Sequence, residues 1–342
     1  MLTLKTYHRT FLYTILHFVV DGICAAIVFS KLYTEEYTTC LIVFLLYNFL
    51  AFLSQPFVGA LMDRFYKPKL FLGVAGIFLS LGFLFHFQFV ISSICLGIGN
   101  SFFHICGGKD VIRKTKNDII SLGIFVSTGA IGLMLGQRYY SDALLISFYS
   151  IFFIGSLMLF LSKAEEEYQV QPIAAPKIKY RTLLLCLVVF VVAIRSFVGK
   201  IVVLDFEVTT WVFVGMAVSQ ALGKMIGGIA AKHLGARTTI IISMAIAILY
   251  LCIWNNSPYT ICAGIFFFNF SMPITLYYAN QLLKGKEGLA FGLLAAALIP
   301  GYLLGMLEYT PLFAQISIAV LCFISVVLII IVEWRGCKNG AL

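Results

Sequence analysis

Charged side chains are scarce in this sequence. Lys and Arg number 24 and Asp and Glu 15 among 342 residues, or 11% of the chain, whereas a soluble domain carries about 25%. Hydrophobic residues make up 61% of the chain, and the mean hydropathy is +1.00. This composition excludes an ordinary soluble protein and indicates a chain embedded in a lipid bilayer.

Motifs for several chemistries are also missing. The sequence contains no GxxxxGK followed by Ser or Thr, no H-E-x-x-H and no G-x-S-x-G. Its nine cysteines include no C-x-x-C pair and lie mostly in apolar runs, where they act as small apolar side chains. We therefore expect no enzyme activity, no cofactor and no metal site.

Long apolar runs dominate what is present. Most of them reach the roughly 20 residues that a helix needs to cross about 30 Å of hydrocarbon. Twelve runs follow one another, at about residues 10–30, 38–62, 69–87, 89–108, 118–137, 142–162, 180–200, 208–231, 237–254, 258–282, 287–307 and 311–333. The sequence therefore predicts an all-α, polytopic membrane protein with twelve transmembrane helices.

Basic residues gather in alternate connections between these runs. If both termini are cytoplasmic, the inside segments hold 19 of the 24 Lys and Arg. The outside connections then hold Lys31, Arg138 and Lys200, while Arg195 and Lys224 fall within the runs. The positive-inside rule favours this orientation, so we expect a multi-pass protein of the bacterial inner membrane. No basic face remains for a nucleic acid.

One connection carries a charged pattern. Residues 55–69 read QPFVGALMDRFYKPK, in which an apolar run ends in a short basic turn and Pro68 prevents the first helix from continuing. The pattern consists of Gly59, Asp63, Arg64 and Lys67. This spacing resembles the signature loop between the second and third helices of the major facilitator superfamily, with Tyr66 in place of the family's second glycine.

This resemblance gives the loop residues expected roles. Gly59 should let a neighbouring helix approach closely. Asp63 should meet the positive N-terminus of a neighbouring helix, together with a cation such as Arg113. In the family, this contact closes the cytoplasmic side of a secondary transporter.

The two halves of the chain repeat with a shift of 169 residues. Gly59 then falls on Gly228, Asn100 on Asn269 and Lys31 on Lys200. The trio Gly123, Gly132 and Gly136 falls on Gly292, Gly301 and Gly305. The resemblance implies two six-helix halves in parallel repeat, with the substrate site between them. The expected domains are residues 1–162 and 180–342, joined by a cytoplasmic linker at 163–179.

The repeated glycines allow two interpretations. They permit close helix packing in any membrane protein, or they let the fifth and eleventh helices rock against the other half. The fifth run resembles the glycine-rich antiporter motif of exporter branches, although Thr128-Gly129 stands near where the family has Gly-Pro. This resemblance favours export over uptake.

Two pairs of polar residues lie within the first and fourth runs. His17 and Asp21 are one turn apart on one face, a spacing that suits a proton site or a static pair orienting the helix. Asn100 and His104 have the same spacing, with His104 as a substrate or proton group or a helix-packing partner. The Phe-His step that ends in His104 resembles the fosmidomycin-resistance branch. The following Lys109-Asp110 should pair with the signature loop.

Cations within the second half suggest the charge of a substrate. Arg195 and Lys224 lie inside runs, and Gln220 stands one turn before Lys224. They attract an anionic substrate or form a salt bridge with Asp21 between the halves. The cavity wall is expected to be completed by Asn269, Tyr277, Tyr278 and Tyr302.

Together these patterns predict a monomeric, proton-coupled secondary transporter for a small anionic or amphipathic organic molecule. Its partners are this molecule, protons and membrane lipid. Two alternatives are proton-coupled uptake of an organic anion, and a non-transporting sensor or lipid scramblase on the same scaffold.

Overall fold

All regular structure in the described part of the chain is helical. The computed structural model describes residues 4–29, 36–162, 179–202, 208–253 and 257–338. Of the predicted features, Lys31 and residues 163–178 of the linker lie outside the described residues.

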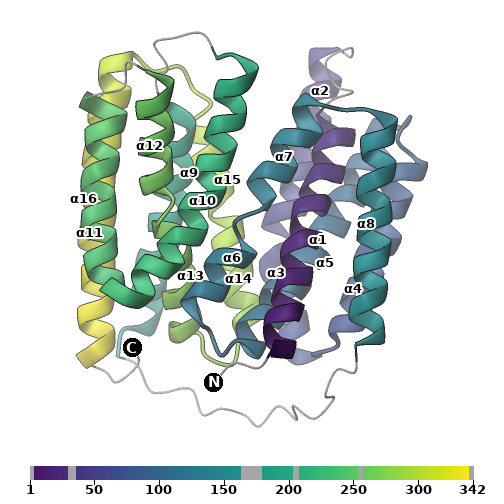
Figure 1. The fold of residues 1–342 in the computed structure, drawn as a ribbon, viewed down its shortest axis with the longest axis horizontal. Helices are drawn as coiled ribbons and strands as arrows, with labels where there is room; N and C mark the ends of the chain where they lie inside the picture. Colours follow the sequence, from purple (N-terminus) through teal and green to yellow (C-terminus); the bar gives the residue numbers. More distant parts are fainter. Residues whose placement is uncertain (1–3, 30–35, 163–178, 203–207, 254–256, 339–342) are drawn as a thin grey trace. The chain divides into compact units, whose positions relative to one another are not determined.

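Figure 1 shows the order of the helices along the chain. They are α1 (Leu4–Val28), α2 (Tyr37–Asn48), a π-helical turn (Phe49–Leu53), α3 (Gln55–Arg64), α4 (Pro68–Leu84), α5 (Phe89–Lys114), α6 (Ile119–Phe125), α7 (Gly129–Arg138), α8 (Asp142–Leu161), α9 (Arg181–Ile201), α10 (Thr210–Leu234), α11 (Ala236–Ile248), a second π-helical turn (Leu249–Ile253), α12 (Pro258–Phe268), α13 (Ser271–Leu282), α14 (Glu287–Ala296), α15 (Leu298–Leu304) and α16 (Pro311–Lys338).

These helices confirm the predicted fold class. Each of the twelve apolar runs corresponds to one helix or to consecutive helical segments. Within the described residues, 11 stretches are long and apolar enough to cross a membrane. The remaining run is α4, whose 17 residues meet the lower limit of about 17 for a spanning helix.

Several runs are broken, which hydropathy did not indicate. The fifth run consists of α6 and α7, with the break at residues 126–128. There Ser127 Oγ donates to the carbonyl of Ile124 at 2.7 Å, and Thr128 Oγ1 donates to the carbonyl of Thr14 on α1 at 2.6 Å. The hydroxyls at the break are thus satisfied by backbone carbonyls, one of the same segment and one of α1.

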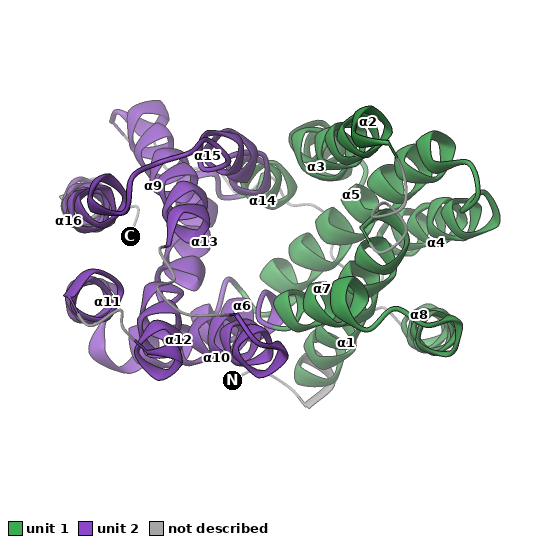
Figure 2. Ribbon diagram, turned by 90° about the horizontal axis from the view of Figure 1, so that it is seen from above, with its two compact units in different colours: residues 1–116, 128–175, 285–292 green, residues 117–127, 176–284, 293–342 purple. Residues whose placement is uncertain are grey.

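The described residues form two compact units, shown in green and purple in Figure 2. Unit 1 comprises residues 1–116, 128–175 and 285–292, and unit 2 comprises residues 117–127, 176–284 and 293–342. The units follow the two sequence halves except at two places. Residues 117–127 belong to the unit of the second half, and residues 285–292 belong to the unit of the first half.

One long helix of each unit packs against three others. In unit 1, α1 packs against α5, α7 and α8, and side chains such as Leu16, Val20 and Ile23 are fully buried. In unit 2, α9 packs against α13, α15 and α16. The pairs α1–α7 and α9–α15 occupy equivalent places in the repeat.

The repeat is also visible in single contacts. In unit 1, a Cβ atom added to Gly59 would overlap the carbonyl oxygen of Gly288. In unit 2, a Cβ atom added to Gly228 would lie 2.6 Å from the carbonyl oxygen of Ile119. A shift of 169 residues turns the first contact into the second, because Gly59 maps to Gly228 and Ile119 maps to Gly288.

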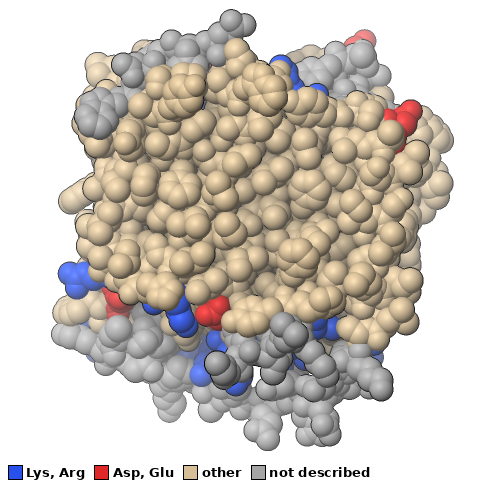
Figure 3. Space-filling model, viewed as in Figure 1, with Lys and Arg blue, Asp and Glu red and all other residues tan. Residues whose placement is uncertain are grey.

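The surface is consistent with immersion in lipid. Figure 3 shows a broad area without charged side chains. The Lys, Arg, Asp and Glu side chains of this face lie near the edges of that area. Large apolar side chains are exposed along the helices, for example Phe57 at 78%, Ile77 at 61% and Phe323 at 65%. With so many apolar helices of spanning length, the chain is an integral membrane protein.

Candidate functional site

The polar pairs of α1 and α5 meet inside unit 1. His17 and Asp21 lie on one face of α1, and α1 packs against α5, which carries Asn100 and His104. His17 Nε2 is 3.3 Å from Asp21 Oδ2, and His104 Nε2 is 3.4 Å from Asp21 Oδ1. Asn100 Nδ2 lies 3.4 Å from Asp21 Oδ1. We call His17, Asp21 and His104 the His–Asp–His cluster.

The backbone of α5 determines the tautomer of His104. Its Nδ1 lies 3.0 Å from the carbonyl oxygen of Asn100, which can only accept, so Nδ1 carries the hydrogen. In a neutral ring, Nε2 then presents a lone pair to Asp21 Oδ1, at 3.4 Å. Two acceptors in this arrangement repel unless a proton or another cation lies between them. A proton on Asp21 or on His104 would turn this contact into a hydrogen bond.

A glycine of α7 covers one side of the cluster. A Cβ atom at Gly129 would overlap Asp21 Oδ2 and lie 2.6 Å from His17 Nε2. Gly129 is the first residue of α7, directly after the break that follows α6. In the sequence, Gly129 stood out only as a departure from a Gly-Pro pair. Its role was missed because no local pattern reveals what a helix covers.

The residues of the cluster and its neighbour Asn100 differ in how far they are exposed. His17, Asn100 and His104 are each less than 9% exposed, whereas the Asp21 side chain is 20% exposed. A carboxylate at this depth costs roughly 2.5–3.5 kcal/mol on insertion scales, so its partners have to compensate it. One ligating atom from each of His17, Asp21 and His104 lies within 4.8 Å of the others. No metal site was predicted from the sequence, in which His17, Asp21 and His104 were interpreted as proton or packing groups.

Asp63 meets two backbone amides at the start of α14. Its Oδ1 accepts from Gly288 N at 2.9 Å, and its Oδ2 accepts from Leu289 N at 2.8 Å. The expected contact with a helix N-terminus is therefore present. The choice of Arg113 as the cation was wrong, because Lys109 Nζ donates to Asp63 Oδ1. The two residues are one turn apart on α5, and only the packing of α3 on α5 decides between them.

Of the other residues of the signature loop, Gly59 contacts a neighbouring helix, whereas Arg64 and Lys67 are exposed. The overlap that a Cβ at Gly59 would make with Gly288 shows the expected close approach. Arg64 and Lys67 are exposed, with the Arg64 guanidinium 5.2 Å from the centre of the Phe65 ring.

A buried ion pair explains the tyrosine in this loop. Asp110 is 1% exposed and accepts from Arg9 Nη2 at 2.7 Å and from the hydroxyl of Tyr66. Burial, with Asp110 adding to it, raises the pKa of Tyr66, so the phenol keeps the hydrogen that it donates. Arg113 stacks on the same ring, 4.2 Å from its centre. Lys109 and Asp110 thus both pair with the loop, as predicted.

We expect Asp63→Asn to slow transport while leaving the protein inserted in the membrane. An amide keeps one oxygen for one of the two backbone N–H groups but turns N–H groups toward the other donor and loses the charge that Lys109 faces. The contact should weaken by roughly 2–3 kcal/mol. Transport rates in proteoliposomes, with membrane insertion checked beforehand, measure the effect.

The repeat supplies a matched control for this experiment. Lys232 is the equivalent of Asp63 and lies 3.3 Å from Asp118 Oδ1, but its side chain is 54% exposed. An exposed pair contributes about 0–1 kcal/mol, so Lys232→Gln should leave transport almost unchanged. Normal rates in Asp63→Asn would remove the signature-loop argument.

Arg195 is a buried cation of unit 2. It lies on α9, is 8% exposed, and its Nη1 lies 3.5 Å from Thr275 Oγ1 on α13. Within the described residues, no carboxylate forms an ion pair with it. Among the described residues, its hydrogen-bond partner is thus a neutral hydroxyl, that of Thr275.

The other cavity candidates of unit 2 are dispersed over several helices. Gln220 and Lys224 are partly buried on α10. Asn269 Nδ2 donates to the carbonyl of Ile265 at 2.8 Å, a bond within its own helix. Tyr278 is 2% exposed, which places its ring in the core. The remaining two are Tyr277, whose hydroxyl accepts from Gln281 Nε2 at 3.1 Å, and Tyr302, whose ring centre lies 5.1 Å from Lys200 Nζ.

A polar contact between the α5–α6 turn and α13 was missed. Asn117 donates from Nδ2 to the carbonyl of Tyr277 at 3.2 Å, and Asn280 Nδ2 donates to Asn117 Oδ1 at 3.2 Å. Asn117 has φ of 59°, a conformation that asparagine tolerates better than most residues. The sequence showed an asparagine in a basic turn and no signal of its partner.

The repeated glycines lie at helix crossings. Added Cβ atoms would overlap the carbonyl oxygens of Phe18 at Gly132, of Gly22 at Gly136 and of Ala193 at Gly301, and would lie 2.6 Å from Lys200 Cβ at Gly305. These four contact helices of their own sequence half. Only Gly123 and Gly292 meet a helix of the other half, since their Cβ atoms would lie 2.6 Å from the carbonyl of Lys224 and 2.5 Å from that of Gln55.

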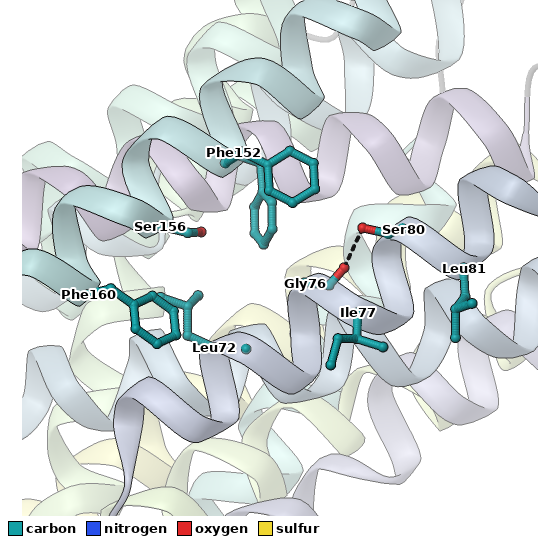
Figure 4. Close-up of a pocket in the computed structure, with 10 residues that line it drawn as sticks. Leu72, Gly76, Ile77, Ser80, Leu81, Phe152, Ser156 and Phe160 are labelled. Atoms are coloured by element: carbon teal, nitrogen blue, oxygen red, sulfur yellow. Dashed lines mark hydrogen bonds between the residues drawn. The ribbon is translucent and has the colours of Figure 1, made fainter.

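An apolar pocket of about 360 Å³ lies between α4 and α8 (Figure 4). Its walls include Leu72, Ile77, Phe152 and Phe160, and Ser80 Oγ is bonded to the carbonyl of its own helix at Gly76. Such walls suit hydrocarbon better than a polar substrate. The pocket is therefore not the candidate site.

Comparison with known proteins supports the fold. No family model matches the sequence, and no curated protein matches it. The structure is similar to the crystal structure of a variant of the E. coli fucose:proton symporter, with a TM-score of 0.67 and 11% identity over 95% of this chain and 98% of that chain. This chain has the major facilitator fold. The predicted all-α polytopic fold is thereby confirmed, and the 11 candidate spans of the described residues are close to the twelve predicted.

Proposed function

We propose that this chain is a secondary transporter of the major facilitator superfamily that couples the movement of a small organic molecule to a proton gradient. The observation that carries the proposal is Asp21, a carboxylate inside a spanning helix that contacts His17, His104 and Asn100. Carboxylates and imidazoles in such positions are typical of proton relays in transporters. The similarity to a fucose:proton symporter supports the same mechanism.

The proton would lie between Asp21 Oδ1 and His104 Nε2. The hydrogen on His104 Nδ1 directs the lone pair of Nε2 toward the carboxylate, so a proton there turns a repulsive contact into a hydrogen bond. Release of the proton restores the repulsion and leaves a charged Asp21 that needs other partners. Such a change can bias two states of a transporter that alternates access to either side.

The proposed cytoplasmic gate is the contact of Asp63 with α14. It joins the signature loop to residues 288 and 289, which follow α13 in the second half of the sequence. Opening toward the cytoplasm would require this contact to break. In this proposal the protein is a monomer of the bacterial inner membrane, with both termini in the cytoplasm and lipid around it.

Two transport directions are candidates. The glycine-rich fifth span resembles that of exporters, which supports proton antiport. The similarity to a fucose:proton symporter supports uptake with the proton. Proteoliposomes with a proton gradient of either sign decide between them. Symport accumulates substrate on the side toward which protons flow, and antiport accumulates it on the side from which they flow.

The substrate class can be tested on purified protein. A panel of sugars, small carboxylates, organic phosphates and amphipathic cations is screened for thermal stabilisation, at about pH 6 and about pH 8 because imidazoles titrate between them. Compounds that stabilise the protein differently at the two pH values then enter the transport assay. If no compound is transported but lipid crosses between leaflets, the alternative of a scramblase replaces this proposal.

We expect Arg195→Gln to weaken binding of an anionic substrate by roughly 2–3 kcal/mol. Arg195 is buried, and its described hydrogen bond is to the neutral hydroxyl of Thr275, so the ligand would supply the opposite charge. Without substrate, the variant should be as stable as the parent or more so. Titration calorimetry and thermal melting measure the two quantities, and Lys224→Gln is tested in the same way.

Arg138→Gln is the matched control, since Arg138 is exposed at the end of α7. It should change neither binding nor melting. Unaltered affinity in Arg195→Gln together with a lower melting temperature would show that a carboxylate of the protein balances the charge. That result would sink the anionic-substrate proposal.

A further inference from the structure

We propose that the His–Asp–His cluster binds a divalent transition-metal ion of the zinc and cobalt class. His17 Nε2, His104 Nε2 and one oxygen of Asp21 would be its ligands. The proposal uses the site of the proposed function, but it rests on the convergence of ligand atoms and not on transport or on a titration. Two imidazoles and one carboxylate are a common ligand set for this class of metal.

The spacing of the ligands fits such an ion. Bonds of about 2.0–2.1 Å at tetrahedral angles place neighbouring ligand atoms about 3.3 Å apart. The observed separations are 3.3 Å for His17 Nε2 to Asp21 Oδ2 and 3.4 Å for His104 Nε2 to Asp21 Oδ1. All three ligand atoms lie within 4.8 Å of one another. The two short separations end on different oxygens of Asp21, so the carboxylate or one imidazole has to rotate for all three ligands to face one ion.

The surroundings of His104 are those of a metal ligand. Metal-binding histidines almost always donate their other ring N–H to a carbonyl or a carboxylate, which orients the ring and fixes the tautomer. His104 Nδ1 makes this bond to the carbonyl of Asn100 at 3.0 Å. The nitrogen that faces Asp21 is then the unprotonated one, as coordination requires.

Two further observations point to a ligand beside Asp21. Asn100 Oδ1 is buried without a hydrogen-bond partner, so turning the amide would offer the ion a fourth ligand, an oxygen. The Asp21 side chain remains 20% exposed, which leaves an approach for the ion or for a coordinated water. Gly129 limits the space on the opposite side, because a Cβ there would overlap Asp21 Oδ2.

The experiment uses Co²⁺ as the probe, on purified full-length protein from which any histidine tag has been removed. Tetrahedral Co²⁺ with nitrogen and oxygen ligands absorbs in the visible range, so binding is read without any transport assay. We expect saturation at a single equivalent, and displacement of Co²⁺ by Zn²⁺. The variants His17→Gln, Asp21→Asn and His104→Gln should each weaken Co²⁺ binding about tenfold or more.

His86→Gln is the matched control. The Nδ1 of His86 lies 2.7 Å from a backbone carbonyl, that of Phe83, as the Nδ1 of His104 does from Asn100, but His86 is only half-buried and lies outside the cluster. It should bind Co²⁺ as the parent does. Melting of each variant without metal shows that it is folded, and an ion-dependent rise in melting temperature, lost in the cluster variants only, gives a second readout.

The outcomes separate this proposal from the proposed function. No visible absorption, or absorption that survives in all three cluster variants because Co²⁺ sits on cysteines, would overturn the metal site and leave the transport proposal standing. Co²⁺ binding that the cluster variants lose supports the site. If Asp21→Asn also keeps full proton coupling, the metal site stands and proton coupling at Asp21 fails.

Discussion

Asp21→Asn should abolish accumulation of substrate driven by a proton gradient while exchange of substrate across the membrane persists. Asparagine has nearly the same shape, so it can still lie between His17 and His104, but it cannot take up a proton. Its amide can donate to His104 Nε2, which mimics the protonated carboxyl group. The variant should therefore be stable and locked in one protonation state. Gradient-driven uptake and counterflow, measured in the same proteoliposomes, reveal this split.

Asp142→Asn controls for the loss of a carboxylate elsewhere. Asp142 is exposed in the first turn of α8, where its Oδ1 accepts from the hydroxyl of Tyr140 at 3.0 Å. That variant should accumulate substrate normally. If Asp21→Asn keeps the full pH dependence of coupled transport, then the cluster only orients α1. Transport would in that case use another coupling group.

The features that were predictable from the sequence are those that a single helix determines. Runs of apolar residues give the spans because the bilayer sets their length. The pairs His17–Asp21 and Asn100–His104 share a face because four residues make about one helical turn. The contact of Asp63 with a helix N-terminus followed from a spacing that resembles a known loop, and the structure contains it.

The features that were not predictable depend on how helices are set against one another. Nothing in the sequence indicates that His104 of α5 lies beside Asp21 of α1. The same limit led to Arg113 instead of Lys109 as the partner of Asp63. The place of Gly129 over the cluster is also of this kind, because it follows from the break between α6 and α7.

The internal repeat is a sequence feature that also predicts how helices pack. A shift of 169 residues was read mainly from glycines, and it maps the Gly59–Gly288 contact onto Gly228–Ile119. The charges do not repeat: Asp63 meets backbone amides and a buried lysine, whereas its equivalent Lys232 forms an exposed pair with Asp118. The backbone crossing is thus common to both halves, and the charges at it have diverged.

Gly132→Ala should lower the stability of the protein more than any other single methyl group added in this region. A Cβ atom at Gly132 would overlap the carbonyl oxygen of Phe18 on α1, and it would lie 3.2 Å from the amide nitrogen of Gly22. Backbone atoms cannot rotate away, so α7 has to move from α1. Overpacking of this kind costs roughly 1–3 kcal/mol, and more where backbone must shift. Because α1 carries Asp21, coupled transport should fall as well.

Gly199→Ala should have the opposite effect to Gly132→Ala and raise the stability of the protein. Gly199 lies near the end of α9 with nothing within 4 Å of an added Cβ, so Gly199→Ala gains helix propensity, up to about 1 kcal/mol. Gly301→Ala, which overlaps the carbonyl of Ala193 in the equivalent crossing of unit 2, should behave like Gly132→Ala. Melting in detergent, followed by dye labelling of the buried Cys24, Cys106 and Cys322 as they become exposed, measures all three. Equal melting temperatures for Gly132→Ala and Gly199→Ala would contradict the close crossing of α1 and α7.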